Sequence, residues 1–260
     1  MKTLFPLWIG EDADAVAAEA EARFIEAMRR TSGEFQVALS GGQTPQALYE
    51  RLAETPDFTA ADWGFAEFLQ VDERCVPPDH PGSNYRMIDE LFLSRAPIAR
   101  SRIHRLRGEL PPDRAAGLAE SEWRDLYPPG TTWPELDFVV LGMGKDGHTA
   151  SLFPGTQALE EEERWITENF VPQLDSWRVT MTFPVLARAR GGVVLVTGED
   201  KAETLMHVLD PELDIDVPIR MLLKRAPRLT LLVDRDAACG LGIKMEDLAL
   251  VDDADEEDEG

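Results

Sequence analysis

Hydrophobic residues recur along this chain with two different spacings, and stretches of the two kinds alternate. In residues 12–30, Val16, Ala20 and Phe24 recur at helical intervals, whereas Val179 and Met181 alternate with polar residues as in a half-buried strand. The helical pattern predicts helices over 12–30, 45–52, 84–93, 113–126 and 201–209. Alternating or short apolar runs predict strands over 35–39, 65–71, 138–141, 178–183, 193–197 and 229–233. Such alternation is typical of a parallel α/β protein.

The chain is expected to form one domain. Its 260 residues are enough for one large α/β domain, and no segment has the composition of a linker. We therefore expect a domain over 1–251. Residues 252–260 include seven acidic residues and no large apolar one, which predicts a disordered tail.

The net charge of −23 excludes some classes of partner. It argues against nucleic acid and against an anionic membrane surface. No apolar run is long enough to span a membrane, and residues 1–9 do not resemble a signal peptide. The two cysteines, Cys75 and Cys239, suggest neither a disulfide framework nor a metal cluster. We expect a protein of the reducing cytoplasm without metal, cofactor or obligate protein partner.

The most informative segment is a glycine-rich turn that follows the strand predicted at 138–141. It presents His148 where open α/β sheets place their chemistry, and Asp146 lies two residues earlier. Histidine is the natural base near neutral pH, and a carboxylate could orient it. Two other interpretations exist: a surface histidine closing a turn, and a dinucleotide fingerprint formed by Gly142, Gly144 and Gly147. The fingerprint is a weak match because it lies outside a first βαβ unit.

A second glycine-rich turn, residues 40–45, follows the strand at 35–39 and opens a helix. Gly41, Gly42 and Thr44 leave backbone N–H groups at a helix N-terminus, which is a site for an anion such as phosphate. The alternative is an ordinary turn with a threonine cap. Lys201 also begins a predicted helix, where a cation is unfavourable unless an anion binds. Arg178 and Lys201 could together clamp the same phosphate.

Three consecutive charged residues, Asp72, Glu73 and Arg74, end the strand predicted at 65–71 and must emerge at the edge of the sheet. The alternative is a solvated loop. Asn84 is either a ligand or a helix cap, and His80 is expected in a turn. His104 and His207 have no motif around them and are expected to be structural or exposed.

Taken in order, these segments resemble one known family along nearly the whole chain. The matching pieces are LSGGQTP (39–45), VDERCVPPDHPGSN (71–84), GMGKDGHTASLFPG (142–155), RVTMTFPVL (178–186), VTGEDKAETL (196–205) and LLVDRDAA (231–238). They resemble the 6-phosphogluconolactonases, of the superfamily shared with glucosamine-6-phosphate isomerase/deaminase. The resemblance implies a single doubly wound, mostly parallel sheet flanked by helices (Rossmann-like) and a sugar-6-phosphate substrate. It also implies that His148 is the base and that Gly41, Gly42, Thr44, Arg178 and Lys201 bind phosphate.

Two positions separate the branches of that superfamily. The resemblance implies that the deaminase branch has the sequence D-E-Y where this chain has Asp72, Glu73 and Arg74. It also implies a glutamate in that branch at the position of Phe153. Lactone hydrolysis needs one activated water and stabilisation of one oxyanion, whereas deamination needs proton shuttling among several groups. The resemblance therefore favours a lactonase; the alternatives are the deaminase and a non-catalytic sugar-phosphate sensor.

The implied reaction is hydrolysis of 6-phospho-D-glucono-1,5-lactone in the pentose phosphate pathway. His148 would activate water and Asp146 would orient the imidazole. Arg74 or backbone N–H groups would meet the oxyanion. Asp72 would position Arg74 or a sugar hydroxyl.

Overall fold

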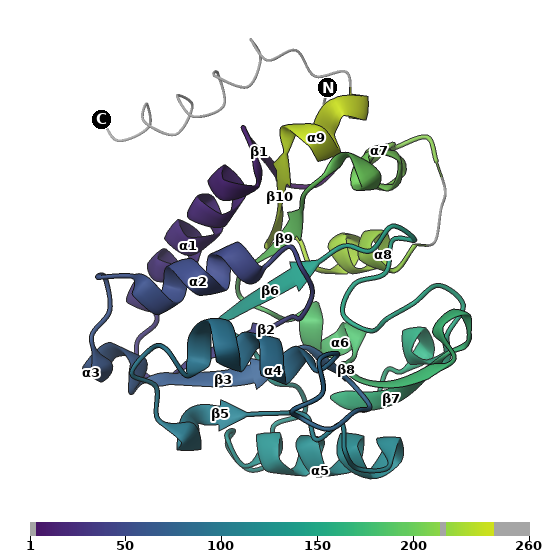
Figure 1. Ribbon diagram of the computed structural model, residues 1–260. Coiled ribbons are helices and arrows are strands. Elements are labelled where there is room, and N and C mark those ends of the chain that lie inside the picture. The colour runs from purple at the N-terminus through teal and green to yellow at the C-terminus, as the bar shows by residue number, and fades with distance from the viewer. Residues whose placement is uncertain (1–3, 214–216, 242–260) are drawn as a thin grey trace.

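The computed structural model describes residues 4–213 and 217–241; the tail predicted at 252–260 lies outside this part. Its centre is a seven-stranded sheet in which every neighbouring pair is parallel, in the order β1-β10-β9-β6-β2-β3-β5. The strands are β1 (Leu7–Gly10), β2 (Phe35–Leu39), β3 (Ala66–Gln70), β5 (Ile103–His104), β6 (Phe138–Gly142), β9 (Gly192–Val196) and β10 (Leu229–Asp234). This confirms the doubly wound parallel sheet (Figure 1). The short edge strands β1 and β5 were not predicted.

Helices cover both faces of this sheet (Figure 1). They are α1 (Ala13–Arg30), α2 (Gln46–Glu54), α3 (Ala60–Trp63), α4 (Asn84–Ile88), α5 (Pro112–Arg124), α6 (Phe183–Leu186), α7 (Ala202–Leu209), α8 (Pro218–Arg225) and α9 (Arg235–Ala238). A π-helical turn, Asp89–Leu93, continues α4 to the predicted end of that helix. Single 3-10 turns lie at Arg100–Arg102, Gln157–Glu160, Pro172–Leu174, Glu199–Lys201 and Cys239–Leu241. None of the helices in the described ranges is both long and apolar enough to cross a bilayer.

The period of two along the strands divides the core into two layers. In β9, Val193 and Leu195 pack with α1 and α2, whereas Val194 and Val196 pack with the helices of the opposite face. Because both faces of the sheet are covered, β9 is apolar throughout and does not alternate with polar residues.

A second sheet, which the hydrophobic pattern did not predict, lies beside the main one. Its order is β4 (Asp72–Arg74), β8 (Ser176–Met181), β7 (Ile166–Val171), and both pairs are antiparallel. The strand predicted at 178–183 is β8, so it belongs to this sheet. β4 was missed because it consists of three charged residues that follow β3 after one intervening valine.

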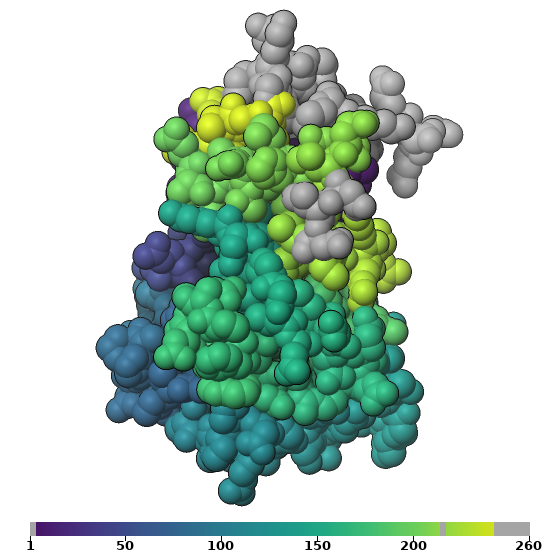
Figure 2. Space-filling view, turned by 90° about the vertical axis from the view of Figure 1, so that its right-hand side faces the viewer, coloured from purple at the N-terminus to yellow at the C-terminus, as the bar shows by residue number. Residues whose placement is uncertain are grey.

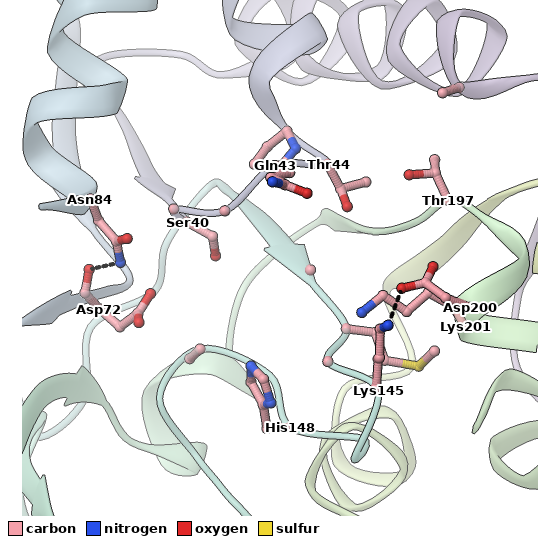
Figure 3. A pocket seen from close by; sticks show the side chains of 18 of the residues that line it. Ser40, Gln43, Thr44, Asp72, Asn84, Lys145, His148, Thr197, Asp200 and Lys201 are labelled. Carbon is pink, nitrogen blue, oxygen red and sulfur yellow. Dashed lines mark hydrogen bonds and ion pairs between the residues drawn. The ribbon is translucent and has the colours of Figure 1, made fainter. Parts of the chain in front are cut away.

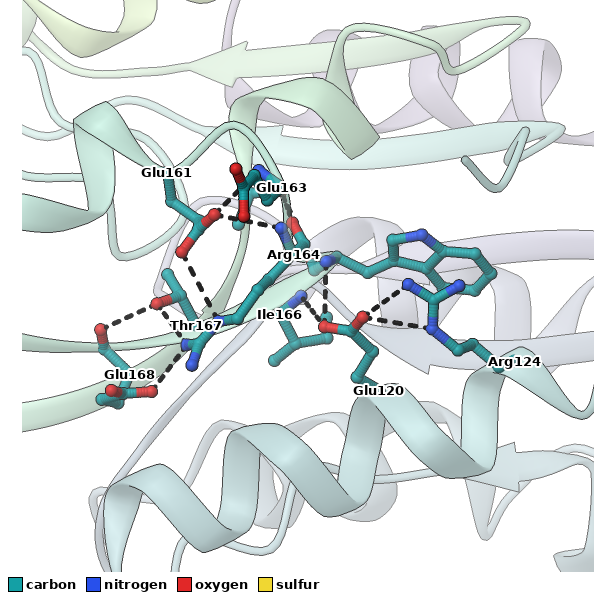
Figure 4. Close-up of polar contacts among 10 residues, drawn as sticks. Glu120, Arg124, Glu161, Glu163, Arg164, Ile166, Thr167 and Glu168 are labelled. Carbon is teal, nitrogen blue, oxygen red and sulfur yellow. Dashed lines mark hydrogen bonds and ion pairs between the residues drawn. The ribbon is translucent and has the colours of Figure 1, made fainter. Parts of the chain in front are cut away.

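The second sheet is attached to α5 by a carboxylate. Glu120 accepts hydrogen bonds from the backbone N–H groups of Trp165 (3.0 Å) and Ile166 (3.4 Å) and pairs with Arg124 (Figure 4). Arg164 adds an ion pair to Glu168 at 2.7 Å. The bonds of Glu120 fix the start of β7, and through it β8, against α5. Figure 2 faces the side of the molecule that carries α7, α8 and the second sheet, where the second sheet (green) lies next to the teal segment after β6.

Candidate active site

The candidate site lies where the strand order of the main sheet reverses. β2 and β6 are neighbours, but the chain continues from them in opposite directions across the sheet. In open α/β sheets, the carboxyl ends of two such strands border a crevice that binds ligands. The loops that begin at Ser40 and Gly142 follow these two strands, and both line a cavity of about 720 Å³ (Figure 3). The two glycine-rich turns singled out in the sequence therefore face the same space.

His148 is held by Asp146 from its own loop. The imidazole Nδ1 lies 2.5 Å from Asp146 Oδ1, which also accepts a hydrogen bond from the His148 backbone N–H at 3.2 Å. Partial burial opposes ionisation of Asp146, but the hydrogen bond and charge of His148 outweigh it and lower the pKa of this carboxyl. In the described part of the chain Nε2 has no hydrogen-bond partner. The imidazole is thus oriented through one nitrogen, while the other remains for a substrate or water.

Glycine is required in this loop because the imidazole lies against the backbone. A Cβ atom on Gly144 would lie 2.1 Å from His148 Nδ1, and Gly147 has a φ of +76°. The loop is tied to its surroundings by a hydrogen bond from the Ile219 N–H to the Gly147 carbonyl, at 2.9 Å. Ala150 has a φ of +53°, in the left-handed region that non-glycine residues rarely adopt. After Gly147 the chain forms no helix before the 3-10 turn at 157, so the dinucleotide interpretation is wrong.

The turn after β2 presents a helix N-terminus to the cavity. Gly41, Gly42 and Thr44 line the cavity, and α2 has no side-chain hydrogen bond at its N-cap, Pro45. The alternative of a threonine cap is therefore wrong. Gly42 has a φ of +104°, and a Cβ on Gly41 would lie 2.0 Å from the amide oxygen of Asn84. The uncapped first turn of α2 remains available to an anion.

Two lysines supply positive charge beside this turn. Lys201 lines the cavity, and burial is the main cause that lowers its pKa. Lys145, which was not predicted as a site residue, lies on the histidine loop and pairs with Asp200 at 2.9 Å (Figure 3). Asp200 directly precedes Lys201, and its carboxylate interacts with the ammonium groups of both Lys145 and Lys201. The cavity thus brings together four of the residues predicted for the site, Gly41, Gly42, Thr44 and Lys201. It adds Lys145, which was not predicted.

Asp72 lies at the wall of the cavity with its carboxylate buried. The Ser151 hydroxyl donates a hydrogen bond to Asp72 Oδ2 at 2.6 Å, and the Asn84 side chain donates to the Asp72 carbonyl at 3.0 Å. Burial raises the pKa of Asp72 against the opposing effects of Ser151 and Arg74. Ser83, and not Asn84, caps α4, so the cap alternative for Asn84 is wrong.

Glu73 is a structural anchor that sequence reasoning did not identify. Its side chain is 1% exposed and accepts hydrogen bonds from the backbone N–H groups of Arg74, Asn84 and Tyr85, at 2.7, 2.7 and 2.8 Å. Gln70 and Ser83 donate two more, at 3.1 and 2.9 Å. The alternative of a solvated loop at 72–74 is therefore wrong, because Glu73 fastens the start of α4 to the end of β4.

Arg178 lies beside the cavity and is not among its lining residues. It lines a depression of about 490 Å³ that adjoins the first cavity and shares His148, Asp72, Arg74 and Lys201 with it. Gly41, Gly42 and Thr44 do not line this depression. The structure therefore brings Arg178 next to the catalytic candidates, and its contact with the phosphate stays a prediction.

The remaining histidines lie outside both cavities. His80 Nδ1 accepts a hydrogen bond from the Gly82 N–H at 2.9 Å, which confirms a turn residue. His104 Nε2 lies 2.7 Å from Glu67 on the neighbouring strand, in a structural position. His207 is in the last turn of α7.

Comparison with known proteins relates the chain to one family. A family model described as glucosamine-6-phosphate isomerases/6-phosphogluconolactonase matches residues 11–231. The probable 6-phosphogluconolactonase 3, chloroplastic, of Oryza sativa subsp. indica is 35% identical over 243 residues, covering 87% of this chain and 73% of that protein. The 6-phosphogluconolactonase of Haemophilus influenzae is 36% identical over 172 residues, covering 66% of this chain and 72% of that protein.

A solved structure extends the comparison to the fold. The 6-phosphogluconolactonase from Trypanosoma cruzi superposes with a TM-score of 0.81 at 26% identity, covering 94% of this chain and 99% of that one. The match of the family model spans the switch-point strands, both glycine-rich turns and the second sheet. The chain belongs to the glucosamine-6-phosphate isomerase/6-phosphogluconolactonase family.

Proposed function

We propose that the protein hydrolyses 6-phospho-D-glucono-1,5-lactone to 6-phospho-D-gluconate, the lactonase step of the oxidative pentose phosphate pathway. The observation that carries this proposal is the His148–Asp146 pair, 2.5 Å apart at the switch point of the sheet and facing a cavity with a cationic end. The two relatives described above are named 6-phosphogluconolactonases, and the order of motifs in this chain is that of the same branch.

The phosphate of the substrate is placed at the turn after β2. Backbone N–H groups at Gly41, Gly42 and the first turn of α2 provide neutral donors, and Lys201 provides charge. Lys145 can turn from Asp200 to the same phosphate because a phosphate dianion competes with an exposed carboxylate. In a protein of net charge −23, this local group of cations attracts the substrate against the overall field.

With the phosphate so placed, the lactone carbonyl lies towards His148. His148 accepts a proton from a water molecule, and the water oxygen attacks C1 to give a tetrahedral oxyanion. As this intermediate collapses, the bond from C1 to the ring oxygen breaks and the imidazolium returns its proton to that oxygen. Asp146 holds the imidazole in one tautomer and stabilises its cation. The carboxylic acid product then loses a proton to solvent.

The site is built for hydrolysis and not for deamination. Phe153, at the position where the deaminase branch has a carboxylate, stacks on the His148 ring with centroids 4.0 Å apart. An apolar ring at this position cannot shuttle protons, whereas hydrolysis needs only the one base. We also propose the reducing cytoplasm as the compartment, which is supported by the free thiols of Cys75 and Cys239.

The experiment follows both reactions with the purified full-length chain. Freshly made 6-phosphogluconolactone should disappear faster than its spontaneous hydrolysis, in proportion to protein concentration. Glucosamine 6-phosphate should release no ammonia under the same conditions. Ammonia release without acceleration of lactone hydrolysis would assign the protein to the deaminase branch and refute the proposal.

A further inference from the structure

A tight turn of the chain follows His148 directly. The Leu152 N–H donates a hydrogen bond to the Thr149 carbonyl at 3.0 Å, and Ala150 between them has a φ of +53°. Backbone strain of this kind persists only where the surrounding contacts hold it in place. The turn brings Ser151, three residues after the proposed base, against the second sheet.

The second sheet holds both backbone groups of Ser151. Its N–H donates to Thr180 Oγ1 on β8 at 3.2 Å, and its carbonyl accepts a hydrogen bond from Asn169 Nδ2 on β7 at 2.8 Å. Asn169 Nδ2 also donates to Thr156 Oγ1 at 2.9 Å. Ser151, Asn169 and Thr180 are all buried. Because hydrogen bonds in a buried network are strong, these contacts fix Ser151 in one orientation.

With its backbone fixed, Ser151 uses its hydroxyl on one oxygen of Asp72. The hydroxyl donates to Asp72 Oδ2 at 2.6 Å, a distance typical of a hydrogen bond to an ionised acceptor. Within the described residues the other oxygen, Oδ1, has no hydrogen-bond partner. Asp72 lines the same cavity as His148, and Figure 3 shows its carboxylate directed at the space between them. One oxygen is thus anchored, and the other is left for a ligand.

The charged form of Asp72 depends on its neighbours because the carboxylate is buried. Burial raises the pKa of Asp72, and the hydrogen bond from Ser151 is the largest effect that opposes it. Charged groups from three elements also face this carboxylate and oppose the rise: Arg74, Arg178 and His148. On the side of α2, Tyr49 interacts with Asp72 but stays protonated, since burial raises the pKa of the phenol. Ser151 therefore both orients the carboxylate and favours its ionised form.

We propose that Ser151 is a positioning residue for the reaction, which fixes the Asp72 carboxylate so that its free oxygen accepts a hydrogen bond from a ring hydroxyl of the substrate. This inference rests on the proposed function and deepens it. Asp72 lines the cavity together with the phosphate turn and His148, so a substrate anchored at these two ends brings its ring hydroxyls to Asp72. A carboxylate that is already immobilised loses no rotational freedom when the substrate binds.

A double-mutant cycle separates this role from a general effect on the histidine loop. Ser151→Ala should lower kcat/KM for 6-phosphogluconolactone about 10-fold, as expected when a hydrogen bond to a charged group is lost. Asp72→Ala removes the carboxylate and should lower kcat/KM at least as much. If Ser151 acts through Asp72, the double variant should match Asp72→Ala to within about 2-fold. An effect transmitted through His148 would persist in that background, and the two losses would multiply.

Two further variants complete the experiment. Ser151→Cys keeps the size of the side chain with a weaker donor, so its kcat/KM should lie between those of the wild type and Ser151→Ala. Running the cycle with Ser151→Cys as well keeps the proposal testable if Ser151→Ala does not fold. Ser83→Ala is the matched control: Ser83 is buried and donates to the buried carboxylate of Glu73 at 2.9 Å, but it lines neither the cavity nor the adjoining depression. This control should lose thermal stability while kcat/KM stays within about 2-fold of the wild type.

The outcomes are distinct once thermal unfolding shows that each variant is folded. Losses that multiply in the double variant would place the effect of Ser151 on the histidine loop and overturn this inference, while leaving the lactonase proposal intact. Wild-type activity of Ser151→Ala, or of Asp72→Ala, would also overturn it. A wild-type protein that does not accelerate lactone hydrolysis would instead refute the proposed function.

Discussion

The imidazole of His148 and the ring of Phe153 are stacked, with centroids 4.0 Å apart and an angle of 22° between their planes. Phe153 is buried, so it forms an apolar wall behind the histidine. With Asp146 on Nδ1 and Phe153 on one face, the orientation of the imidazole is fixed from two directions. Phe153, one of the two positions that favour the lactonase branch in the sequence, therefore contacts the proposed base directly.

Phe153→Glu should not convert the protein into a deaminase. The change places a carboxylate in a buried position beside His148, which should cost about 1–3 kcal/mol of unfolding free energy and reduce lactone hydrolysis about 10-fold or more. Lactone hydrolysis and ammonia release from glucosamine 6-phosphate are measured side by side. Phe153→Leu, which keeps an apolar wall, is the control and should retain most of the activity. Substantial ammonia release by Phe153→Glu would show that this single position determines the reaction.

Gly144→Ala should impair catalysis more than folding. Its Cβ would lie 2.1 Å from His148 Nδ1 and 2.7 Å from Asp146 Oδ1, so the pair must move. A displacement of about 1 Å in a catalytic group can reduce the rate about 100-fold, and overpacking costs about 1–3 kcal/mol. Gly117→Ala, in α5 with no atom within 4 Å of the added Cβ, is the matched control. Steady-state kinetics and urea unfolding of both variants test this; a fully active Gly144→Ala would contradict the described position of the imidazole.

Lys201 and the Lys145–Asp200 pair should affect binding of phosphate rather than chemistry. Lys201→Ala should raise the KM for the phosphorylated lactone about 10-fold or more with little change in kcat. Asp200→Asn frees Lys145 and should lower the KM a few-fold at low ionic strength, an effect that salt removes. Lys224→Ala, an exposed lysine of α8, is the control. Unphosphorylated gluconolactone should be insensitive to all three changes, and an equal loss for that substrate would indicate a structural role.

Asp72→Asn should stabilise the protein while reducing activity. Burial raises the pKa of Asp72, so the folded state binds this proton more tightly than the unfolded chain does. The free energy of unfolding of the wild type therefore falls as pH rises from the ordinary aspartate pKa towards the raised value. The Asp72→Asn variant lacks this titrating group, so its free energy of unfolding does not decline in this way. At neutral pH it should exceed that of the wild type by about 1 kcal/mol. Urea unfolding at several pH values checks the sign: a stability difference that shrinks as pH rises would contradict it.

The strong local patterns of the chain predicted the main sheet and the two loops at its switch point. β2 and β6 are apolar runs followed by glycine turns, so the positions of Gly41 and His148 follow from sequence neighbours. The second sheet could not be predicted in this way. β4 has three charged residues, and its pairing with β8 joins segments about a hundred residues apart.

Contacts between side chains of the site could not be predicted from local patterns either, where they join distant segments. Lys145 was missed because its partner, Asp200, lies on another loop. Glu73 was missed because five donors from three segments bury it, and a charged triplet by itself indicates solvent exposure. Arg178 was predicted as a cation of the site, but its pairing with Arg74 across the second sheet was not. Long-range register, and not local pattern, decides these contacts.

The central claim is that His148 activates water for lactone hydrolysis. The most direct measurement compares the decay of freshly made 6-phosphogluconolactone without protein, with wild-type protein and with His148→Ala, while titration of 6-phosphogluconate monitors binding. The account predicts that the wild type accelerates the decay and that His148→Ala loses about 10²–10⁴-fold of that acceleration while still binding the product, because the base acts in the transition state. A His148→Ala variant that hydrolyses the lactone at nearly the wild-type rate would contradict the account.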